Sequence, residues 1–357
     1  MSNSKYVGLD VHQASTSIAV LDHSGKLVVE ATIKTKADAI RDFISGLSGT
    51  VHVTFEEGTQ AAWLYEVIKP LVAELVVCDP RQNKLLKAGN KGDRIDANKL
   101  AQLLRAGLLK AVYHGNQQTK TLKQLAHNYS SMLSDTTRVM NRIKALFRGQ
   151  GIPCAGRDVY YRRNRDKWLA RLTEPGLRTR AQFLFEEFDA IKPLRRKAKS
   201  ALLREARRHQ AFEILSNIQT LGPIRVAQII AAVGSPNRFR TRRQFWAYCG
   251  FAVVTRTTDD YRFDEGLAFR RRRPAATRGL NRNYNRRLKH VFKSAALYGI
   301  RKDPFKSYYQ ARVAGGMRPE MARLTLARKI ANITLTLWKN GGEFDGQKLA
   351  NNEIEPK

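Results

Sequence analysis

The stretch Lys91-Gly-Asp-Arg-Ile-Asp-Ala-Asn-Lys-Leu100 decides how the first third of this chain folds. It follows a glycine-rich turn and passes into an apolar pattern at Leu100 and Leu103, which predicts that a helix begins here. Asp93 and Asp96 are three residues apart, so they share one face of that helix. Two neighbouring carboxylates repel each other unless a cation lies between them, and a divalent metal ion is a common solution. The alternative is that Asp93 caps the helix and Asp96 interacts favourably with the helix dipole.

Two further acidic residues stand at the ends of predicted strands upstream. Asp10 ends a buried first strand that begins at Val7, and Glu56 closes the alternating strand Val51–Phe55. Burying an unpaired carboxylate is costly, so Asp10 should have a cationic partner. Together with Asp93 and Asp96, these residues fit a two-metal phosphoryl-transfer site in which Mg²⁺ ions stabilise the attacking and leaving oxygens.

The order of elements in the N-terminal third predicts an α/β domain with a ribonuclease-H-like (RuvC-like) fold, in which three antiparallel strands precede alternating helices and strands. The expected strands are Tyr6–Asp10, Ser17–Leu21, Leu27–Ile33, Val51–Glu56 and Glu74–Cys78, and the expected helices are Ala37–Leu47, Trp63–Val72 and one that opens at Asp93.

Positive charge is confined to the rest of the chain. Residues 1–115 hold 14 basic and 12 acidic side chains, whereas residues 116–357 hold the remaining 50 basic and 19 acidic ones of a chain with a net charge of +33. Such an asymmetry is typical of a surface that binds a polyanion, and nucleic acid is the expected partner. The basic residues are spread over too many positions to form one amphipathic membrane anchor.

The basic part of the chain reads as mainly helical. Two long helical patterns, 117–147 and about 180–215, predict an antiparallel coiled-coil arm, with an ordinary helical linker domain as the alternative. A helical hairpin follows, with its turn at Thr220–Gly222, where phosphate binding and simple packing are both open readings. Met321–Trp338 predicts a core helix, and the tail after Gly341 is expected to be loose.

The densest basic region covers residues 262–290, where arginines alternate with aromatic residues. This combination suits neutralisation of a phosphate backbone together with stacking on bases, although a charge run is often only a solvated face. The predicted nucleic-acid-binding residues are Arg270, Arg271, Arg272, Arg273, Arg278, Arg282, Arg286 and Arg287.

The remaining features argue for a cytoplasmic protein. No run approaches the roughly 20 apolar residues that cross a bilayer, and the N-terminus lacks the pattern of a signal peptide. Cys78, Cys154 and Cys249 are far apart and have no metal-ligand spacing, so neither a zinc site nor a disulfide is expected.

Several motifs together resemble a known family, in order and over nearly the whole length. They are Gly-Leu-Asp10-Val-His, Phe-Glu56-Glu-Gly-Thr, Asn-Lys-Gly-Asp93-Arg-Ile-Asp96-Ala-Asn-Lys-Leu-Ala, the stretch from Arg238 to Phe251, and Arg278-Gly-Leu-Asn-Arg-Asn. The chain resembles DEDD-type insertion-sequence transposases (insertion-sequence family 110/1111), also called bridge-RNA-guided recombinases.

The resemblance implies a domain plan and a mechanism. It implies a RuvC-like catalytic domain at 1–115, a coiled-coil arm at 116–212 and a C-terminal transposase domain at 213–342, followed by the tail 343–357. Members of this family cut and rejoin DNA through a covalent phosphoserine, with a structured RNA that pairs with donor and target DNA. Homodimers or tetramers, association with the nucleoid and Mg²⁺ as the cofactor are the corresponding expectations. The family's glutamate maps to Glu56, with Glu57 as the runner-up.

One departure from the family pattern concerns the nucleophile. The family's serine falls a few residues after Gly250-Phe251, where this chain reads Thr255-Arg-Thr-Thr-Asp259, and Thr258 fits the spacing best, with Thr257 adjacent. Threonine also carries a hydroxyl, so either Thr258 replaces the serine or the copy is impaired. A β-branched strand end is the structural alternative for both threonines.

Two other functions therefore remain open. One is a junction-type metal-dependent nuclease that uses water as the nucleophile, and the other is a non-catalytic nucleic-acid-binding relative. An actin-like phosphotransferase ranks last, because no second glycine-rich phosphate loop is found.

Overall fold

A computed structural model of the chain describes residues 3–83, 92–114, 119–258, 261–264, 267–270 and 275–350. The chain divides into two compact units, residues 1–114 and 115–357. Arg271, Arg272, Arg273 and the last seven residues of the expected tail lie outside the described residues.

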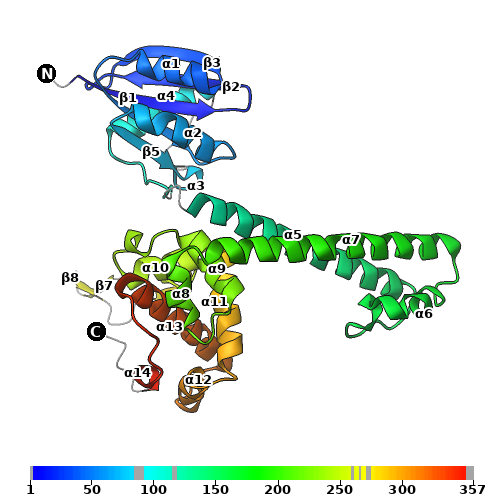
Figure 1. Cartoon of the computed structure of the whole chain (residues 1–357). Helices are drawn as coiled ribbons and strands as arrows, with labels where there is room; N and C mark the ends of the chain where they lie inside the picture. Colours follow the sequence, from blue (N-terminus) through cyan, green and yellow to red (C-terminus); the bar gives the residue numbers. More distant parts are fainter. Residues whose placement is uncertain are drawn as a thin grey trace. The chain divides into compact units, whose positions relative to one another are not determined.

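The first unit is built on one mixed sheet (Figure 1). Its elements are β1 (Ser4–Val11), β2 (Ser15–Leu21), β3 (Leu27–Lys34), α1 (Ala37–Ser45), β4 (Thr50–Glu56), α2 (Ala61–Ile68), the 3₁₀ turn η1 (Lys69–Leu71), β5 (Glu74–Cys78), α3 (Pro80–Asn83) and α4 (Asp93–Arg105). The strand order is β3-β2-β1-β4-β5, with β1, β2 and β3 antiparallel and β1, β4 and β5 parallel. The expected element order, and with it the mixed α/β character of this part, is confirmed.

Helices cover both faces of this sheet. Alternation along β1 sends Val7 and Leu9 to the face where they pack with Ile40 of α1 and Leu64 of α2. Gly8 points to the opposite face, where a Cβ atom would overlap the Ala97 carbonyl oxygen of α4 and lie 2.6 Å from the amide nitrogen of Ala101. α4 therefore lies directly on β1, and only a glycine allows that approach.

The second unit is mainly helical, as expected. Its helices are α5 (Lys120–Gly149), α6 (Arg165–Leu169), α7 (Pro175–Ala206), α8 (Gln210–Ser216), α9 (Pro223–Val233), α10 (Arg242–Cys249), α11 (Arg286–Gly299), α12 (Phe305–Ala314), α13 (Pro319–Asn340) and α14 (Gln347–Ala350), with 3₁₀ turns η3 (Asp158–Tyr160), η4 (Arg162–Asn164) and η5 (Pro236–Arg238). Its strands are β6 (Val253–Thr258), β7 (Tyr261–Asp264), β8 (Leu267–Arg270) and β9 (Ala275–Leu280).

The two longest helices, α5 and α7, lie side by side and run in opposite directions (Figure 1). Near the start of α5, Leu122 belongs to the same apolar core as Leu202, which lies near the end of α7. At the other end, Phe147 packs against Phe185, with ring centroids 6.4 Å apart. The C-terminal helices α9, α11 and α13 pack into the core at the first of these ends.

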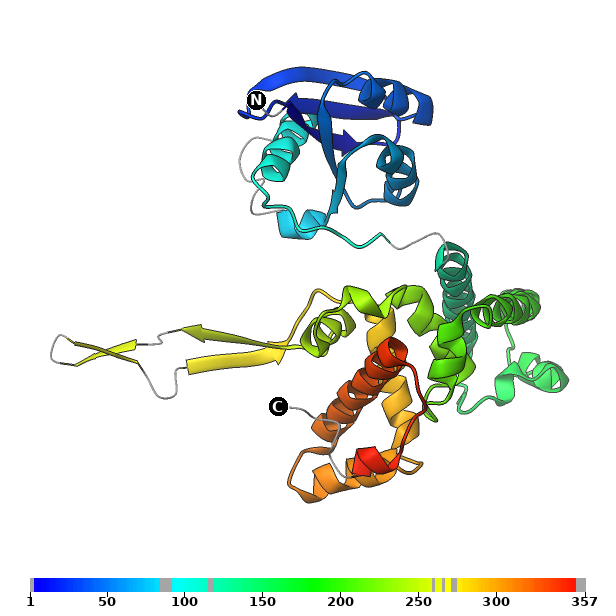
Figure 2. The same cartoon turned by 60° about the vertical axis from the view of Figure 1, so that its left-hand side comes forward.

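Two regions of the second unit differ from the sequence expectation. The basic region forms two antiparallel strand pairs, β6–β9 and β7–β8, which Figure 2 shows extending from the helices. The strand end named as the alternative at Thr257 and Thr258 is present as the end of β6, whereas basic residues concealed the strand pattern of β7, β8 and β9. Residues 343–350, expected to be loose, include α14; Leu349 is fully buried, and the Phe344 ring stacks on the Phe305 ring with centroids 5.2 Å apart.

None of the helices within the described ranges is long and apolar enough to cross a membrane.

Candidate active site at the edge of the sheet

The ends of β1 and β4 bring Asp10 and Glu56 to one edge of the sheet. The two strands are parallel, and Leu9 pairs with Phe55, so Asp10 and Glu56 occupy the next position on neighbouring strands. Both residues follow an inward-facing apolar residue, and alternation turns their side chains to the α4 face of the sheet. Strand register thus places two acids that are 46 residues apart in the sequence at adjacent positions.

The start of α4 supplies the other two predicted acids. Gly92 is the N-cap residue, no side chain caps this helix end, and Asp93 and Asp96 lie in the first turn. The alternative reading, in which Asp93 caps the helix, is therefore wrong. Its Oδ1 atom lies instead 3.4 Å from Nε2 of His12.

His12 links the strand to the helix. Its Nε2 atom lies 3.3 Å from Oδ2 of Asp10 as well as 3.4 Å from Oδ1 of Asp93. The ligand atoms of these three residues all lie within 4.8 Å of one another. An octahedral ion with bonds of about 2.1 Å separates adjacent ligands by roughly 3 Å and opposite ligands by roughly 4.2 Å. One imidazole nitrogen and two carboxylate oxygens at these separations fit a divalent metal ion.

This cluster is open to solvent. The side chain of Asp10 is 21% exposed, whereas those of His12 and Asp93 are 52% and 61% exposed. An ion held here would keep coordination positions for water or a substrate oxygen, as Mg²⁺ sites commonly do. His12 belongs to one of the family motifs, but the sequence alone predicts no role for it. The available signal was its position two residues after Asp10, immediately beyond the strand end.

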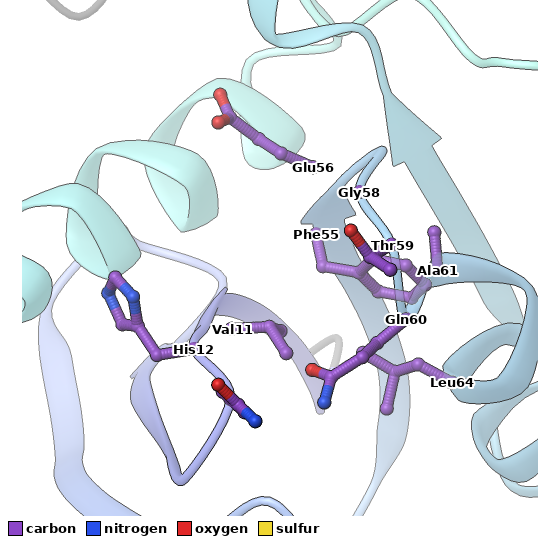
Figure 3. Close-up of a pocket in the computed structure, with 10 residues that line it drawn as sticks. Val11, His12, Phe55, Glu56, Gly58, Thr59, Gln60, Ala61 and Leu64 are labelled. Atoms are coloured by element: carbon purple, nitrogen blue, oxygen red, sulfur yellow. The ribbon is translucent and has the colours of Figure 1, made fainter. Parts of the chain in front are cut away.

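Glu56 lies with His12 around a pocket of about 540 Å³. Figure 3 shows the Glu56 carboxylate pointing away from the apolar side chains of Phe55 and Leu64, which also line this pocket. Glu56 and Asp96 do not belong to the group of three ligand atoms found in the described part of the chain. The structure therefore brings together Asp10 and Asp93, adds His12, and places Glu56 beside them at the pocket.

The neighbouring Glu57 has a different set of contacts. Its Oε2 atom lies 2.8 Å from Nε2 of His114, whose ring stacks on Tyr65 with centroids 4.7 Å apart. Its backbone N–H donates a hydrogen bond to the carbonyl oxygen of Cys78 on β5. Glu57 therefore joins β4 to the segment after α4, and Glu56 is the glutamate that lines the pocket.

Thr257 and Thr258 are the last two residues of β6, in the second unit. Their backbones pair with Ala276 and Ala275 of β9.

The predicted arginines are spread over several elements of the second unit. Arg270 ends β8, Arg278 lies on β9, and Arg282 is exposed in the segment before α11. Arg286 and Arg287 are exposed in the first turn of α11 and line a groove with Arg138 of α5. Arg287 donates a hydrogen bond to Nδ1 of His127, 2.7 Å away, because a guanidinium has no acceptor.

The turn of the helical hairpin, Thr220–Gly222, is held by packing. Arg225 donates hydrogen bonds to Oγ of Ser294, at 3.0 Å, and to the carbonyl oxygen of Thr220, at 3.2 Å. Burial lowers the pKa of Arg225. These contacts favour packing over phosphate binding as the role of the turn.

Carboxylates lie at the ends of adjacent parallel strands, and the second unit of the chain is strongly basic. This combination is compatible with the class of proteins that use acidic side chains and a metal ion in chemistry on nucleic acid. Comparison with known families specifies the class further. Residues 7–150 match the DEDD-type IS110 model described as "Transposase", and residues 212–310 match the model described as "Transposase IS116/IS110/IS902 family". The chain belongs to the IS110 family of DEDD transposases.

Two curated proteins illustrate the relationship. The transposase for insertion sequence element IS1533 of Leptospira borgpetersenii is 34% identical over 116 residues, which are 30% of this chain and 32% of that protein. The predicted transposase y4qE of Sinorhizobium fredii (strain NBRC 101917 / NGR234) is 23% identical over 273 residues, 71% of this chain and 65% of that protein. The matches thus span about a third and just under two thirds of these relatives.

Proposed function

We propose that this protein is a DNA transposase that cuts and rejoins DNA strands, with its acids on the first unit and its hydroxyl nucleophile on the second. The observation that carries the proposal is the cluster of Asp10, His12 and Asp93 at the carboxyl ends of the parallel strands. Membership of the IS110 transposase family supports it. A ribonuclease-H-like fold for the first unit agrees with the strand order β3-β2-β1-β4-β5.

Asp10, His12 and Asp93 would hold one Mg²⁺ ion, and Glu56 and Asp96 would complete the binding of a second. Bound there, Mg²⁺ supplies positive charge that stabilises the attacking and leaving oxygens of a phosphoryl transfer. The carboxylates would repel the anionic phosphodiester if they met it directly, so their role would be to hold the cations, and the exposure of Asp93 leaves room for the DNA strand.

Thr258 is the proposed nucleophile. Its Oγ1 atom attacks phosphorus, which forms a threonine–phosphate ester and breaks the bond to a sugar oxygen. The hydroxyl proton leaves Oγ1, and the sugar oxygen gains a proton as it departs. A sugar hydroxyl of the second strand then attacks the same phosphorus, so the strand is rejoined and Thr258 is released.

The basic second unit would hold the nucleic acids. The proposed contacts to donor and target DNA and to a structured guide RNA are Arg270, Arg271, Arg272, Arg273, Arg278, Arg282, Arg286 and Arg287. The antiparallel pair of α5 and α7 would act as a coiled-coil arm that joins subunits into a dimer or tetramer. The protein would work in the cytoplasm, at the nucleoid.

The experiment is detection of a covalent protein–DNA adduct. Purified protein is incubated with Mg²⁺, the RNA encoded beside its gene and both DNA partners, then denatured and resolved by electrophoresis. Wild type and Thr258→Ser should form the adduct, whereas Thr258→Ala should not. Adduct formation by Thr258→Ala but not by Thr257→Ala would move the nucleophile to Thr257.

A second candidate follows from the threonine itself. Its secondary alcohol is bulkier than the serine found in the family, so an impaired copy that only binds nucleic acid is the alternative. That candidate predicts no adduct from wild type and restored adduct formation with Thr258→Ser. DNA cleavage without any peptide on the DNA ends would instead support a nuclease that uses water.

A further inference from the structure

A second pocket, of about 510 Å³, lies wholly within the second unit. It is bordered by α10, the segment that leads into β6, α12 and α13. Three of its lining side chains are cationic, namely Arg243, Arg328 and Lys329, and none of the described residues that line it is acidic. The arginines predicted from the sequence to bind nucleic acid do not include Arg243 or Arg328.

Two of the three cations of this pocket, Arg328 and Lys329, are buried at least in part and have contacts with the protein. Arg328 is partly buried, and its Nε atom donates a hydrogen bond of 2.9 Å to the carbonyl oxygen of Phe251. Burial lowers the pKa of Arg328. The Lys329 side chain is only 3% exposed, and its Nζ atom lies 5.7 Å from the ring centroid of Tyr308. Within the described chain no acidic residue forms an ion pair with Arg243, which is exposed, or with Arg328. An anion that enters the pocket therefore meets one exposed cation and, in Arg328, one that is only partly solvated.

Two polar atoms from the same lining point to a ligand that also makes hydrogen bonds. Oδ1 of Asn332 and Nε1 of Trp246 are buried and have no hydrogen-bond partner among the residues that the structure describes. Buried polar side-chain atoms are almost always paired, and exceptions often mark a functional site. One of these atoms is an acceptor and the other a donor, which matches the mixed hydrogen-bonding edge of a nucleobase.

We propose that this pocket holds one unstacked nucleotide of a single-stranded nucleic acid. Arg243 and Arg328 bind its phosphate, the base lies against the aromatic side chains, and Asn332 and Trp246 contact the polar edge of the base. The volume is larger than a phosphate needs, and aromatic side chains with cations are the usual means of binding single strands. The inference rests on the proposed function, since it assumes that the polyanion is DNA or RNA.

The position of the pocket suits this role. Thr255 lines it, and Thr258 lies three residues further along β6, or about 10 Å at roughly 3.3 Å per residue. A nucleotide bound here would position the nucleic-acid strand that continues past the end of β6.

The test measures binding, without any catalytic step. Full-length protein in EDTA is titrated into a fluorescent single-stranded oligonucleotide, and fluorescence anisotropy gives the affinity. An abasic oligonucleotide with the same backbone and inorganic phosphate serve as the other probes. The variants are Arg243→Ala, Trp246→Phe and Asn332→Leu, and the control is Arg196→Ala, an exposed arginine on α7.

We expect Arg243→Ala to weaken binding of both oligonucleotides by about tenfold, and Asn332→Leu and Trp246→Phe to weaken only the one that carries bases, by about fivefold or more. The control should change binding by less than about twofold. Asn332→Leu should melt no lower than wild type, because it replaces an unpaired polar atom with an apolar group of similar size.

Equal affinity of wild type, Asn332→Leu and Trp246→Phe for the base-carrying oligonucleotide would overturn the assignment. The assignment would also be overturned if wild type bound the two oligonucleotides with equal affinity and inorganic phosphate competed with them. The pocket would then be a site for phosphate alone. If the variants lose binding while wild type forms no DNA adduct, the pocket stands and the transposase proposal fails. If wild type forms the adduct and the variants bind normally, the transposase proposal stands and the assignment of the pocket fails.

Discussion

The two units group side chains of opposite charge. In the first unit, Asp10 and Asp93 lie on either side of His12 at an edge that is open to solvent. In the second unit, Arg328 and Lys329 line a pocket without acidic residues in its described lining. Like charges that are held together raise the free energy of the empty protein and lower it again when a ligand of opposite charge binds. The difference is what the proposed function requires, in which the first unit binds metal cations and the second unit binds a polyanion.

The largest expected effect comes from removing charge in the first unit while keeping shape. Asp10→Asn should lower DNA cutting by at least about 1,000-fold, because the metal supplies several kcal/mol of stabilisation to the transition state. Nucleic-acid binding measured in EDTA should stay within about twofold of wild type. Mn²⁺ titration followed by electron paramagnetic resonance checks the metal directly.

A matched control for Asp10→Asn is Asp38→Asn, since Asp38 is 91% exposed on α1 and pairs only with Arg41 among the described residues. It should bind Mn²⁺ and cut DNA as wild type does. If Asp10→Asn binds Mn²⁺ with wild-type affinity, the cluster at the edge of the sheet is not the metal site. The proposed difference in ligand between the two units would then be wrong.

The next effect concerns the contact that sets α4 against the sheet. In Gly8→Ala the new methyl group would overlap the Ala97 carbonyl oxygen, so α4 must move away from β1. We expect the first unit to lose about 3 kcal/mol of stability, the upper end of overpacking costs. Hydrogen exchange of α4 amides should quicken while that of α13 stays unchanged. Gly58→Ala is the control, because its Cβ would have no atom within 4 Å.

The sequence predicted more of the first unit than of the second, for physical reasons. Alternation and turn signals in β1, β4 and α4 suffice to place Asp10, Glu56, Asp93 and Asp96 at element ends. The sequence did not reveal the role of His12, because a histidine after a strand is ordinary until a helix far along the chain brings Asp93 within reach. Nor did it reveal the pairing of β6 with β9, since the strand pattern of β9 was not recognised within the basic region. The pocket around Asn332 was not predicted either, because its lining comes from four segments.

A smaller effect separates two adjacent glutamates of the first unit. Glu56→Gln should weaken Mn²⁺ binding by at least about tenfold, because it removes a carboxylate proposed to bind the second ion. Glu57→Gln should leave Mn²⁺ affinity within about threefold and instead loosen the contact with His114. If Glu57→Gln weakens Mn²⁺ binding more than Glu56→Gln does, Glu57 is the metal-binding glutamate.

The smallest effect lies in the helical arm of the second unit and concerns its stability. Arg165 donates hydrogen bonds of 2.6 and 2.7 Å to the two oxygens of Asp189, and these bonds lower the pKa of Asp189. A lowered pKa means that the pair stabilises the fold above the unfolded pKa of about 3.9 and that this stabilisation is lost as pH falls through the folded value. Because the Asp189 side chain is 36% exposed, we expect about 1 kcal/mol for Asp189→Asn at pH 7.

The measurement is thermal unfolding of wild type and Asp189→Asn from pH 7 down to pH 3. The melting temperatures should differ by a few degrees at pH 7, and the difference should shrink below about pH 4 as Asp189 takes up a proton. Glu187→Gln is the control on the same helix, because the Glu187–Arg142 pair is about half exposed on both sides and should contribute less. A difference that stays constant down to pH 3 would mean that Asp189 acts through packing, and charge would then matter in the second unit only where nucleic acid binds.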